Sequence, residues 1–279
     1  MPDKRFHFGQ FSLALFLPLA LSTSCLTLFS MPQILLAQGI PERWEFQEYS
    51  PPDDIDQPRI KEPAGTRSLK GGCYSSGKPL TALLPSSQLG VTVAEYPALV
   101  VYMPVLGTEP STIPVEFVLE TQSGEEVYKA TFQTSQMSGI VTLSLPNTAG
   151  LSPLKIGEDY YWHFSVICNE NERSQDLVVG GVVRRVELNS NLKEQLSLAS
   201  AKEQAELYAA AGIWQDAVST LVQLRRDNPK DLELAADWEK LLKAVDLGNI
   251  AQEPIEPLPT TTLSQPQGSV QIQLEQFGL

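Results

Sequence analysis

Residues 160–168 read Tyr-Tyr-Trp-His-Phe-Ser-Val-Ile-Cys, and this stretch decides the fold. Large apolar side chains occupy alternate positions, which is the period of a β-strand with one buried face. The buried face is predicted to carry Tyr160, Trp162, Phe164, Val166 and Cys168. The opposite face carries Tyr161, His163, Ser165 and Ile167. A strand so rich in aromatic residues predicts the central strand of a β-sheet domain.

Short runs of β-type residues continue on both sides of this strand, from residue 80 to residue 188, and turn residues separate them. This texture is typical of a β-sandwich. The turn Gln122-Ser-Gly124 predicts a tight hairpin, because glycine accepts the positive φ that such a turn needs. Strands are expected at residues 80–84, 91–94, 98–103, 115–121, 126–133, 140–145, 160–168 and 177–187.

The approach to the central strand, Leu154-x-x-Gly157-x-x-Tyr160-x-Trp162, is similar to a strand start of immunoglobulin-like and fibronectin-like sandwiches. In those domains a Leu closes the end of the core and a Tyr pins the corner. We therefore expect a mostly β fold with added α structure. Its immunoglobulin/fibronectin-like β-sandwich spans residues 71–188.

After the last predicted strand the apolar period changes from two to about 3.6, so residues 189–248 are predicted to form a helical hairpin domain of three helices. Asn191 and Glu194 match a capping box at the start of the first helix. Asp231 is expected to cap the third helix and Gly248 to end it. The helices are expected at residues 191–210, 215–226 and 231–247.

Part of this helical segment has the spacing of a tetratricopeptide repeat, in which two antiparallel helices pack through small residues. Gly212 would permit the tight turn between the helices, whereas Gln204 and Ala205 depart from the usual Leu-Gly pair. One such unit is too short to form a peptide groove, so packing is favoured over peptide recognition. The matching positions are Tyr208, Gly212, Trp214, Ala217, Leu221, Leu224 and Pro229.

Residues 1–37 are predicted to be a secretory signal peptide. A basic pair precedes a stretch from residue 8 to residue 41 without any charged side chain, and Ala37 offers the small residue that a signal peptidase requires. The protein is therefore expected to be exported to the periplasm or cell envelope. An uncleaved anchor and a lipid on Cys25 are the alternative forms of membrane attachment.

Cleavage would leave Cys73 and Cys168 in an oxidising compartment, where they are expected to form a disulfide. Two separate buried thiols are the alternative. Residues 38–70 are rich in proline and contain Asp53-Asp54-Ile-Asp56. They predict a solvated linker, because the acidic patch lacks the glycine and the glutamate of a calcium-binding loop. Residues 249–279 are predicted to form a disordered tail, because they contain four prolines and lack the apolar content to fold alone.

The composition excludes some classes of partner. The formal net charge is -13 and the pI is about 4.6, so nucleic acid and anionic lipid would be repelled.

No catalytic, cofactor-binding or metal-binding residue is predicted, and the protein is not expected to be an enzyme. Residues 72–78 have the spacing of a phosphate-binding loop, but Pro79 replaces the hydroxyl residue that would hold magnesium. His163 lies in the middle of a strand rather than in a loop. A polar pocket that gathers carboxylates around His163 would favour an enzyme of unfamiliar type. The candidate interaction surface comprises Tyr161, His163 and Trp214.

A combination of short motifs is spread along the chain: Leu80-Thr-Ala-Leu-x-Pro85, Pro97-x-Leu-x-x-Tyr102-x-Pro104, Gly139-Ile with Ser144-Leu-Pro146, Tyr160-x-Trp162 leading to Cys168, Gly181-x-Val183-x-Arg185 and Gly212-Ile-Trp-x-Asp-Ala217. Together they resemble the exported cyanobacterial family catalogued as domain of unknown function 928, over roughly residues 73–255. The family is uncharacterised, so the resemblance implies export and a two-part layout but no catalytic residues. Arg185 and Trp214 fit the family pattern and are interpreted as structural.

These observations favour a non-enzymatic protein of the cell envelope that acts by protein–protein interaction, with another envelope protein as its partner. The alternative is a carbohydrate-binding β-sandwich module, in which an aromatic side chain such as Tyr161 stacks on a sugar. No cofactor is expected in either case.

Overall fold

The computed structural model describes residues 77–106, 112–135, 138–148 and 150–256, which belong to one compact unit. The predicted signal peptide, the linker, Cys25, Cys73 and the tail beyond residue 256 lie outside these residues. Within the described ranges, no helix is both long and apolar enough to cross a membrane.

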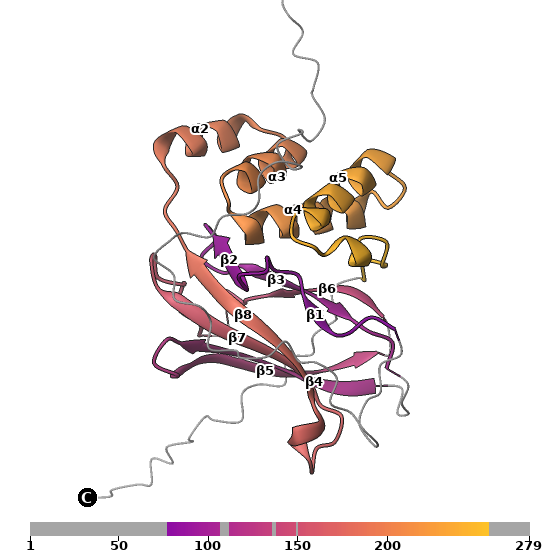
Figure 1. Ribbon diagram of the computed structural model, residues 1–279. Coiled ribbons are helices and arrows are strands. Elements are labelled where there is room, and N and C mark those ends of the chain that lie inside the picture. Colours follow the sequence, from indigo (N-terminus) through magenta and orange to yellow (C-terminus); the bar gives the residue numbers. More distant parts are fainter. Residues whose placement is uncertain (1–76, 107–111, 136–137, 149, 257–279) are drawn as a thin grey trace, which may run out of the picture. The chain divides into compact units, whose positions relative to one another are not determined.

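The described strands form two sheets (Figure 1). The order is β1-β3-β6 in the three-stranded sheet and β2-β8-β7-β4-β5 in the five-stranded sheet. All neighbours are antiparallel except β2 and β8, which are parallel. The strands are β1 (Thr81–Ala82), β2 (Leu89–Thr92), β3 (Ala98–Met103), β4 (Thr112–Thr121), β5 (Glu126–Ser135), β6 (Gly139–Ser144), β7 (Asp159–Val166) and β8 (Leu177–Arg185).

Each of the eight predicted strands is present, with shifts of a few residues at the ends. The predicted hairpin is confirmed, since β4 and β5 pair on either side of a turn in which Gly124 has φ +83°. The coarse prediction of β structure followed by α structure is also confirmed. The prediction of three helices in residues 189–248 is wrong, because these described residues form four α-helices.

The four α-helices are α2 (Ser190–Leu198), α3 (Ala201–Ala210), α4 (Trp214–Asp227) and α5 (Leu232–Lys243). The predicted first helix is divided, because Ser200 starts a new helix through a capping box with Glu203. Asn189, not Asn191, caps α2 by accepting a hydrogen bond from the Leu192 amide. Two short 3-10 helices complete the described elements, at Arg173–Gln175 and Gly248–Ile250.

The end of the helical segment also differs from the prediction. Asp231 caps α5 as expected, but the helix ends at Lys243, and Gly248 begins the second 3-10 helix instead of closing α5. The chain then returns to the three-stranded sheet, where the Ile140 amide donates to the Pro254 carbonyl and the Glu256 amide to the Ile140 carbonyl. Residues 250–256 are therefore packed against the fold, although the sequence assigned them to the tail.

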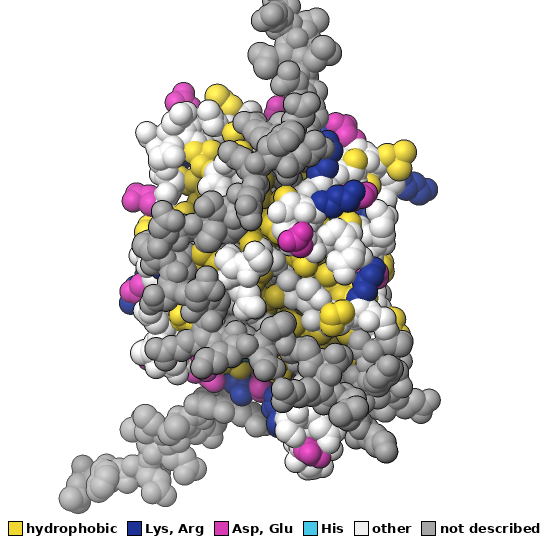
Figure 2. Space-filling model, in the orientation of Figure 1, with side chains coloured by type: hydrophobic (Ala, Val, Ile, Leu, Met, Phe, Trp, Pro, Cys, Tyr) yellow, Lys and Arg dark blue, Asp and Glu magenta, His cyan; other side chains and the backbone are white. Residues whose placement is uncertain are grey.

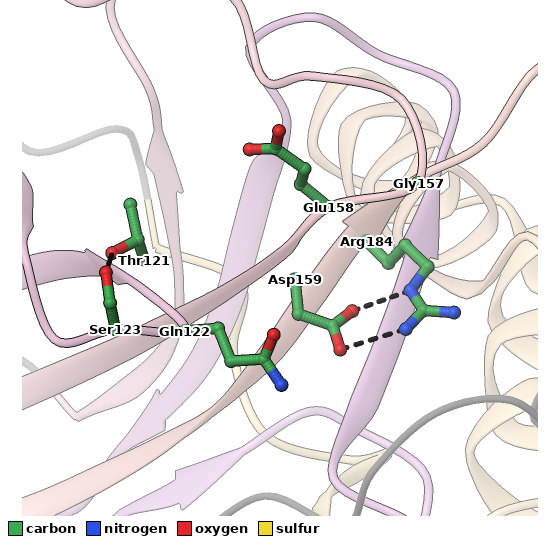
Figure 3. A pocket seen from close by; sticks show the side chains of 7 residues that line it. All are labelled: Thr121, Gln122, Ser123, Gly157, Glu158, Asp159 and Arg184. Carbon is green, nitrogen blue, oxygen red and sulfur yellow. Dashed lines mark hydrogen bonds and ion pairs between the residues drawn. The ribbon is translucent and has the colours of Figure 1, made fainter.

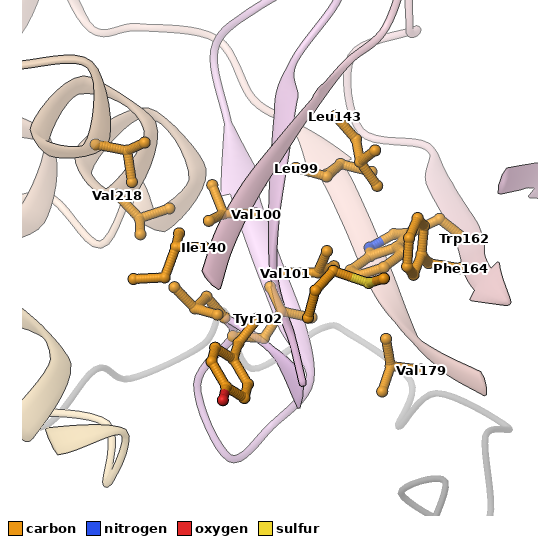
Figure 4. Close-up of a cluster of buried hydrophobic side chains, with 14 of the residues drawn as sticks. Leu99, Val100, Val101, Tyr102, Ile140, Leu143, Trp162, Phe164, Val179 and Val218 are labelled. Carbon is orange, nitrogen blue, oxygen red and sulfur yellow. The ribbon is translucent and has the colours of Figure 1, made fainter. Parts of the chain in front are cut away.

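The main core lies between the two sheets. Trp162 and Phe164 of β7 are fully buried and point toward Leu99 and Val101 of β3 (Figure 4). The predicted inward face of residues 160–166 is confirmed. Burial of these large aromatic side chains stabilises the fold.

Strand β3 is buried on both faces, which explains its unbroken apolar run. Leu99 and Val101 face β7, whereas Val100 faces Val218 of α4 (Figure 4). The three-stranded sheet thus lies between the five-stranded sheet and the helices, and its β3 contributes to the packing on either side.

Helix α4 is fixed to the sheets by polar contacts from its first turn. The Trp214 indole N–H donates to the Leu83 carbonyl at 2.8 Å, and the Gln215 amide donates to the Ala98 carbonyl at 3.3 Å. The Val93 amide donates to the Asp216 carboxylate at 3.1 Å. These bonds satisfy backbone groups of the sheets that the helix covers, so the position of α4 is specified by more than apolar contact.

We predict that Trp214→Phe destabilises the fold by about 1–3 kcal/mol, because a smaller aromatic ring replaces the indole and the buried Leu83 carbonyl loses this donor. Urea unfolding followed by circular dichroism measures the change. Leu232→Ala is the control, since Leu232 is 84% exposed and its truncation should change stability by less than about 0.5 kcal/mol. Equal stability of Trp214→Phe and the wild type would contradict the assigned bond.

A second prediction concerns pH. Burial raises the pKa of the Asp216 carboxyl, although hydrogen bonds from Thr92 and Val93 oppose the shift. A raised folded-state pKa means that the folded state binds the proton more tightly than the unfolded chain. The contribution of this group to stability is therefore greatest below the unfolded-state pKa and falls as pH rises through the folded-state pKa.

Asp216→Asn keeps an oxygen acceptor and removes the buried charge. The variant is expected to gain stability relative to the wild type as pH rises from acid to neutral. Urea midpoints measured over a pH series provide the test. A variant that is most disadvantaged at neutral pH would show that the charged carboxylate is favoured at this position.

Candidate functional site

A polar pocket of about 430 Å³ lies at one end of the five-stranded sheet (Figure 3). The turn between β4 and β5 forms one wall, the start of β7 forms another, and β8 contributes an arginine. Hydroxyl, amide, carboxylate and guanidinium groups all face this space. The lining residues are Thr121, Gln122, Ser123, Gly157, Glu158, Asp159 and Arg184.

The hairpin turn is fixed by its own hydrogen bonds. The hydroxyls of Thr121 and Ser123 are 2.8 Å apart, and the Glu125 amide donates to the Thr121 hydroxyl at 3.2 Å. The Gly124 amide donates to the Thr121 carbonyl. The turn therefore holds Gln122 at its tip, where the side chain reaches toward Asp159 (Figure 3).

The opposite wall depends on the loop that leads into β7. Gly157 has φ +78°, a conformation that glycine adopts at low cost, and its amide donates to the Arg185 carbonyl at 2.8 Å. Leu154 is buried, and the Lys155 amide donates to the Tyr160 hydroxyl at 3.2 Å. These contacts set the positions of Glu158 and of Asp159, the first residue of β7.

Asp159 and Arg184 form the floor of the pocket. They lie opposite each other in the register of β7 and β8. The Asp159 carboxylate accepts from Arg184 Nε at 2.6 Å and from Nη2 at 2.9 Å, and the side chains are only 5% and 11% exposed. Two parallel charge-assisted bonds give this pair a fixed orientation.

Glu158 lies nearer to solvent than Asp159. Its carboxylate accepts from Lys155 Nζ at 3.2 Å and from the Tyr160 hydroxyl at 3.4 Å. The same contact raises the pKa of Lys155. Both carboxylates of the pocket are thus matched by a cation, so the lining is polar with little uncompensated charge.

The structure separates the three residues of the predicted interaction surface. Tyr161 and His163 lie on the outer face of β7, as predicted, and His163 Nε2 is 3.9 Å from a Glu120 carboxylate oxygen. Tyr161 packs against the buried cluster of Leu89, Val91 and Val182.

Trp214 does not contribute to this surface, because it is only 3% exposed and its indole lies between α4 and the sheets. The interpretation of Trp214 as an exposed interaction residue is therefore not supported, whereas its interpretation as a structural residue agrees with the geometry. The aromatic ring of an amphipathic helix indicates burial as readily as it indicates a binding surface.

Arg185 also has a structural position. Its Nη1 donates to the Leu154 carbonyl at 2.9 Å, and its Nη2 lies 3.1 Å from a Glu95 carboxylate oxygen. The side chain therefore ties the end of β8 to the loop before β7.

Cys168 follows β7 and is half-buried. Cys73 lies outside the described residues, so the disulfide between them stays a prediction.

The pocket is suited to binding through hydrogen bonds. Across the described ranges, no group of three or more His, Cys, Asp or Glu side chains is arranged to hold a metal ion. His163 is not among the lining residues, so the pocket does not combine it with Glu158 and Asp159.

The pocket was not predicted from the sequence, because no binding role was assigned to Glu158, Asp159 or Arg184. The sequence did contain a signal for this pair, Asp159 and Arg184, because two oppositely charged residues lie in or next to runs of apolar strand residues. Arg184 lies within the apolar run of β8, and Asp159 directly precedes the aromatic run of β7. A charge inside such a run needs a buried counter-charge.

Comparison with family models shows a match to Domain of Unknown Function (DUF928) over residues 62–255, which is more than half of the chain. The chain belongs to the DUF928 family. The match includes both sheets, the four helices and the pocket of this DUF928 protein. The resemblance noted from the sequence motifs is confirmed as family membership.

No curated protein matches the DUF928 chain. Among solved structures, similarity is found to a putative beta-galactosidase from Bacteroides fragilis, at 18% identity over 40% of this chain and 16% of that one, with a TM-score of 0.22. The apo b-glucuronidase from Ruminococcus gnavus has 15% identity over 60% of this chain and 37% of that one, with a TM-score of 0.20. The chain therefore spans well under half of either enzyme, and TM-scores this low support no conclusion about fold or function.

Breaking the pair at the floor of the pocket is predicted to be costly. Asp159→Leu should destabilise the DUF928 protein by roughly 3–5 kcal/mol, because the buried Arg184 guanidinium loses this carboxylate. The double variant Asp159→Leu/Arg184→Met should recover most of that loss, since it removes both charges. Urea unfolding of Asp159→Leu, of Arg184→Met and of the double variant measures the coupling free energy between the two side chains.

Lys155→Ala serves as the matched control, because the Lys155–Glu158 pair is exposed to solvent and should contribute little to stability. A double variant as unstable as the sum of its singles would show that the two side chains do not depend on each other.

Proposed function

We propose that the protein is an exported, non-enzymatic component of the cell envelope that acts by binding another protein. The outer edge of β5 is the proposed contact surface, and the observation that carries the proposal is the length of this edge that no other described strand pairs with. Export is supported by the N-terminal sequence, in which an uncharged apolar stretch follows a basic pair.

Strand β5 is ten residues long and lies at the end of the strand order, so among the described residues it pairs only with β4. Its other edge presents backbone N–H and C=O groups, which can extend the sheet by accepting a further strand. Natural edge strands are commonly protected by proline, by bulges or by charge. Residues 126–135 contain no proline, the register irregularity beside Val127 is confined to the start of the strand, and the Lys129 ammonium is paired with Glu116 of β4.

The other sheet edges are shorter or covered. Strand β1 has two residues and β2 has four, and α4 contacts β2. The start of β6 is bridged by Ile255. Strand β5 is therefore the described edge with the greatest capacity for pairing.

The side chains of β5 indicate what the added strand should carry. Tyr128, Ala130 and Phe132 point to the core side and are half-buried, with Tyr128 near Phe117 and Phe132 near Phe164. An added strand with apolar residues at alternate positions would cover this half-buried row. The partner is thus inferred to be an extended segment with a period of two.

The face shown in Figure 2 has no concentration of described charged side chains that would indicate a binding surface other than the β5 edge. There the described acidic and basic side chains are scattered rather than gathered in a block of one sign. Backbone pairing at β5 requires no such block.

We also infer the finer classification of the two parts. The buried Leu154 and the bond from Lys155 to Tyr160 support an immunoglobulin/fibronectin-like sandwich. The turn at Gly212, with φ +72°, and the fully buried Ala217 support a tetratricopeptide-like hairpin of α3 and α4. Because α4 packs on β2 and β3, this hairpin is inferred to have a packing role.

The double variant Thr131→Lys/Gln133→Lys tests the proposal. Both side chains are exposed on β5, so the fold should be kept, while added charge on the edge should oppose pairing with another strand. Recovery of the partner from an envelope extract by the immobilised protein is expected to fall at least about tenfold.

The matched control is Asn171→Lys/Ser174→Lys, which adds the same charge at exposed positions in the connection between β7 and β8. Equal recovery by the two double variants would exclude β5 as the contact. If the protein forms concentration-dependent dimers and only Thr131→Lys/Gln133→Lys fails to form them, the partner at β5 is a second copy of the chain and not another protein. Turnover of a substrate by the purified protein would overturn the non-enzymatic assignment.

A further inference from the structure

We propose that the polar pocket between the β4–β5 turn and the Asp159–Arg184 pair binds a short neutral saccharide. This site is distinct from the β5 edge, and the inference does not depend on the protein interaction proposed above. It also differs from the sugar platform expected at Tyr161, because Tyr161 is not among the lining residues.

The lining selects a ligand that forms hydrogen bonds over most of its surface. Apart from Gly157, every lining residue carries a hydroxyl, amide, carboxylate or guanidinium group. An apolar ligand would desolvate these groups without replacing their hydrogen bonds to water. A polyhydroxylated molecule both donates and accepts at each hydroxyl, and therefore matches this mixture of donors and acceptors.

The charges of the pocket argue against an anionic ligand. Two carboxylates and one guanidinium line it, and the guanidinium is engaged with Asp159 through two bonds. A phosphate or a uronate would approach Glu158 and Asp159 without a dedicated cation. The net charge of -13 adds to the repulsion.

A metal cation is not favoured either. Glu158 is paired with Lys155, and Asp159 with Arg184, so both candidate carboxylate ligands already have cationic neighbours. Hard cations such as calcium require six to eight oxygen ligands. The site therefore suits a ligand without charge.

The site is preorganised for such a ligand. The Asp159 and Arg184 side chains are almost buried and are joined by two hydrogen bonds. Their conformations are therefore already fixed before a ligand binds. The carboxylate oxygens retain further acceptor positions after they accept from Arg184, and they can receive hydrogen bonds from neighbouring sugar hydroxyls. On the other side, the exposed Gln122 amide offers a donor and an acceptor from the hydrogen-bonded turn between β4 and β5 (Figure 3).

The size of the pocket is also adequate. A volume of about 430 Å³ falls in the range of small-molecule sites, which is about 300–1,000 Å³. A short saccharide would fit between Gln122 and Glu158 with its hydroxyls directed to the Asp159–Arg184 floor.

Isothermal titration calorimetry tests the proposal by measuring the affinity of the full chain for short neutral hexose and pentose oligosaccharides. At least one of them should bind, and Gln122→Ala should weaken that binding about tenfold, because an exposed amide is removed from the mouth of the pocket. Asp159→Asn should weaken it at least as much. If Asp159→Asn fails to fold, the test rests on Gln122→Ala, whose side chain is exposed.

Two variants serve as matched controls. Gln133→Ala removes the same amide at an exposed position on β5, and Tyr161→Ala removes the aromatic residue that precedes His163 on the outer face. Both should retain binding, and so should Thr131→Lys/Gln133→Lys. The proposal is overturned by the absence of binding to any neutral saccharide, by stronger binding of uronate oligosaccharides, or by loss of binding in Tyr161→Ala with Gln122→Ala unaffected.

Discussion

The burial of β3 on both faces is the constraint on which the rest of the structure depends. Leu99 and Val101 complete the core with β7, while Val100 lies against Val218 of α4. Without the helices, one face of the three-stranded sheet would be exposed to water, and without the five-stranded sheet the other face would be. Each part therefore covers apolar surface that the other leaves open, and the two-part layout is a single folding unit in energetic terms.

Local pattern in the sequence was sufficient to predict elements but not their neighbours. The alternation in residues 160–166 predicted both the strand and its buried face, and the turn at Gly124 predicted the β4–β5 hairpin. The run from Ala98 to Met103 predicted a strand, yet not the helix that covers its second face. The parallel pairing of β2 with β8 likewise depends on contacts between residues about ninety positions apart, which no local period encodes.

The candidate site shows the same limit more sharply. No binding role was assigned to Glu158 and Asp159 from the sequence. The register that places Asp159 opposite Arg184 changes that interpretation, and register is a property of strand pairing. Trp214 illustrates the converse error, since it was placed in the candidate interaction surface from the sequence although it is only 3% exposed. Its role is to give the covered Leu83 carbonyl a hydrogen-bond donor.

The two proposed binding surfaces share one structural element. Gln122 and Ser123 belong to the turn that joins β4 to β5, so the turn that lines the pocket also fixes the start of the open edge. A ligand that restrains this turn would reduce the entropy lost when β5 accepts another strand. Linkage then requires the added strand to strengthen ligand binding by the same factor. The hairpin is thus the element through which a bound saccharide would be sensed at the protein contact, and the strength of that coupling depends on how rigid the Thr121–Ser123 turn already is without ligand.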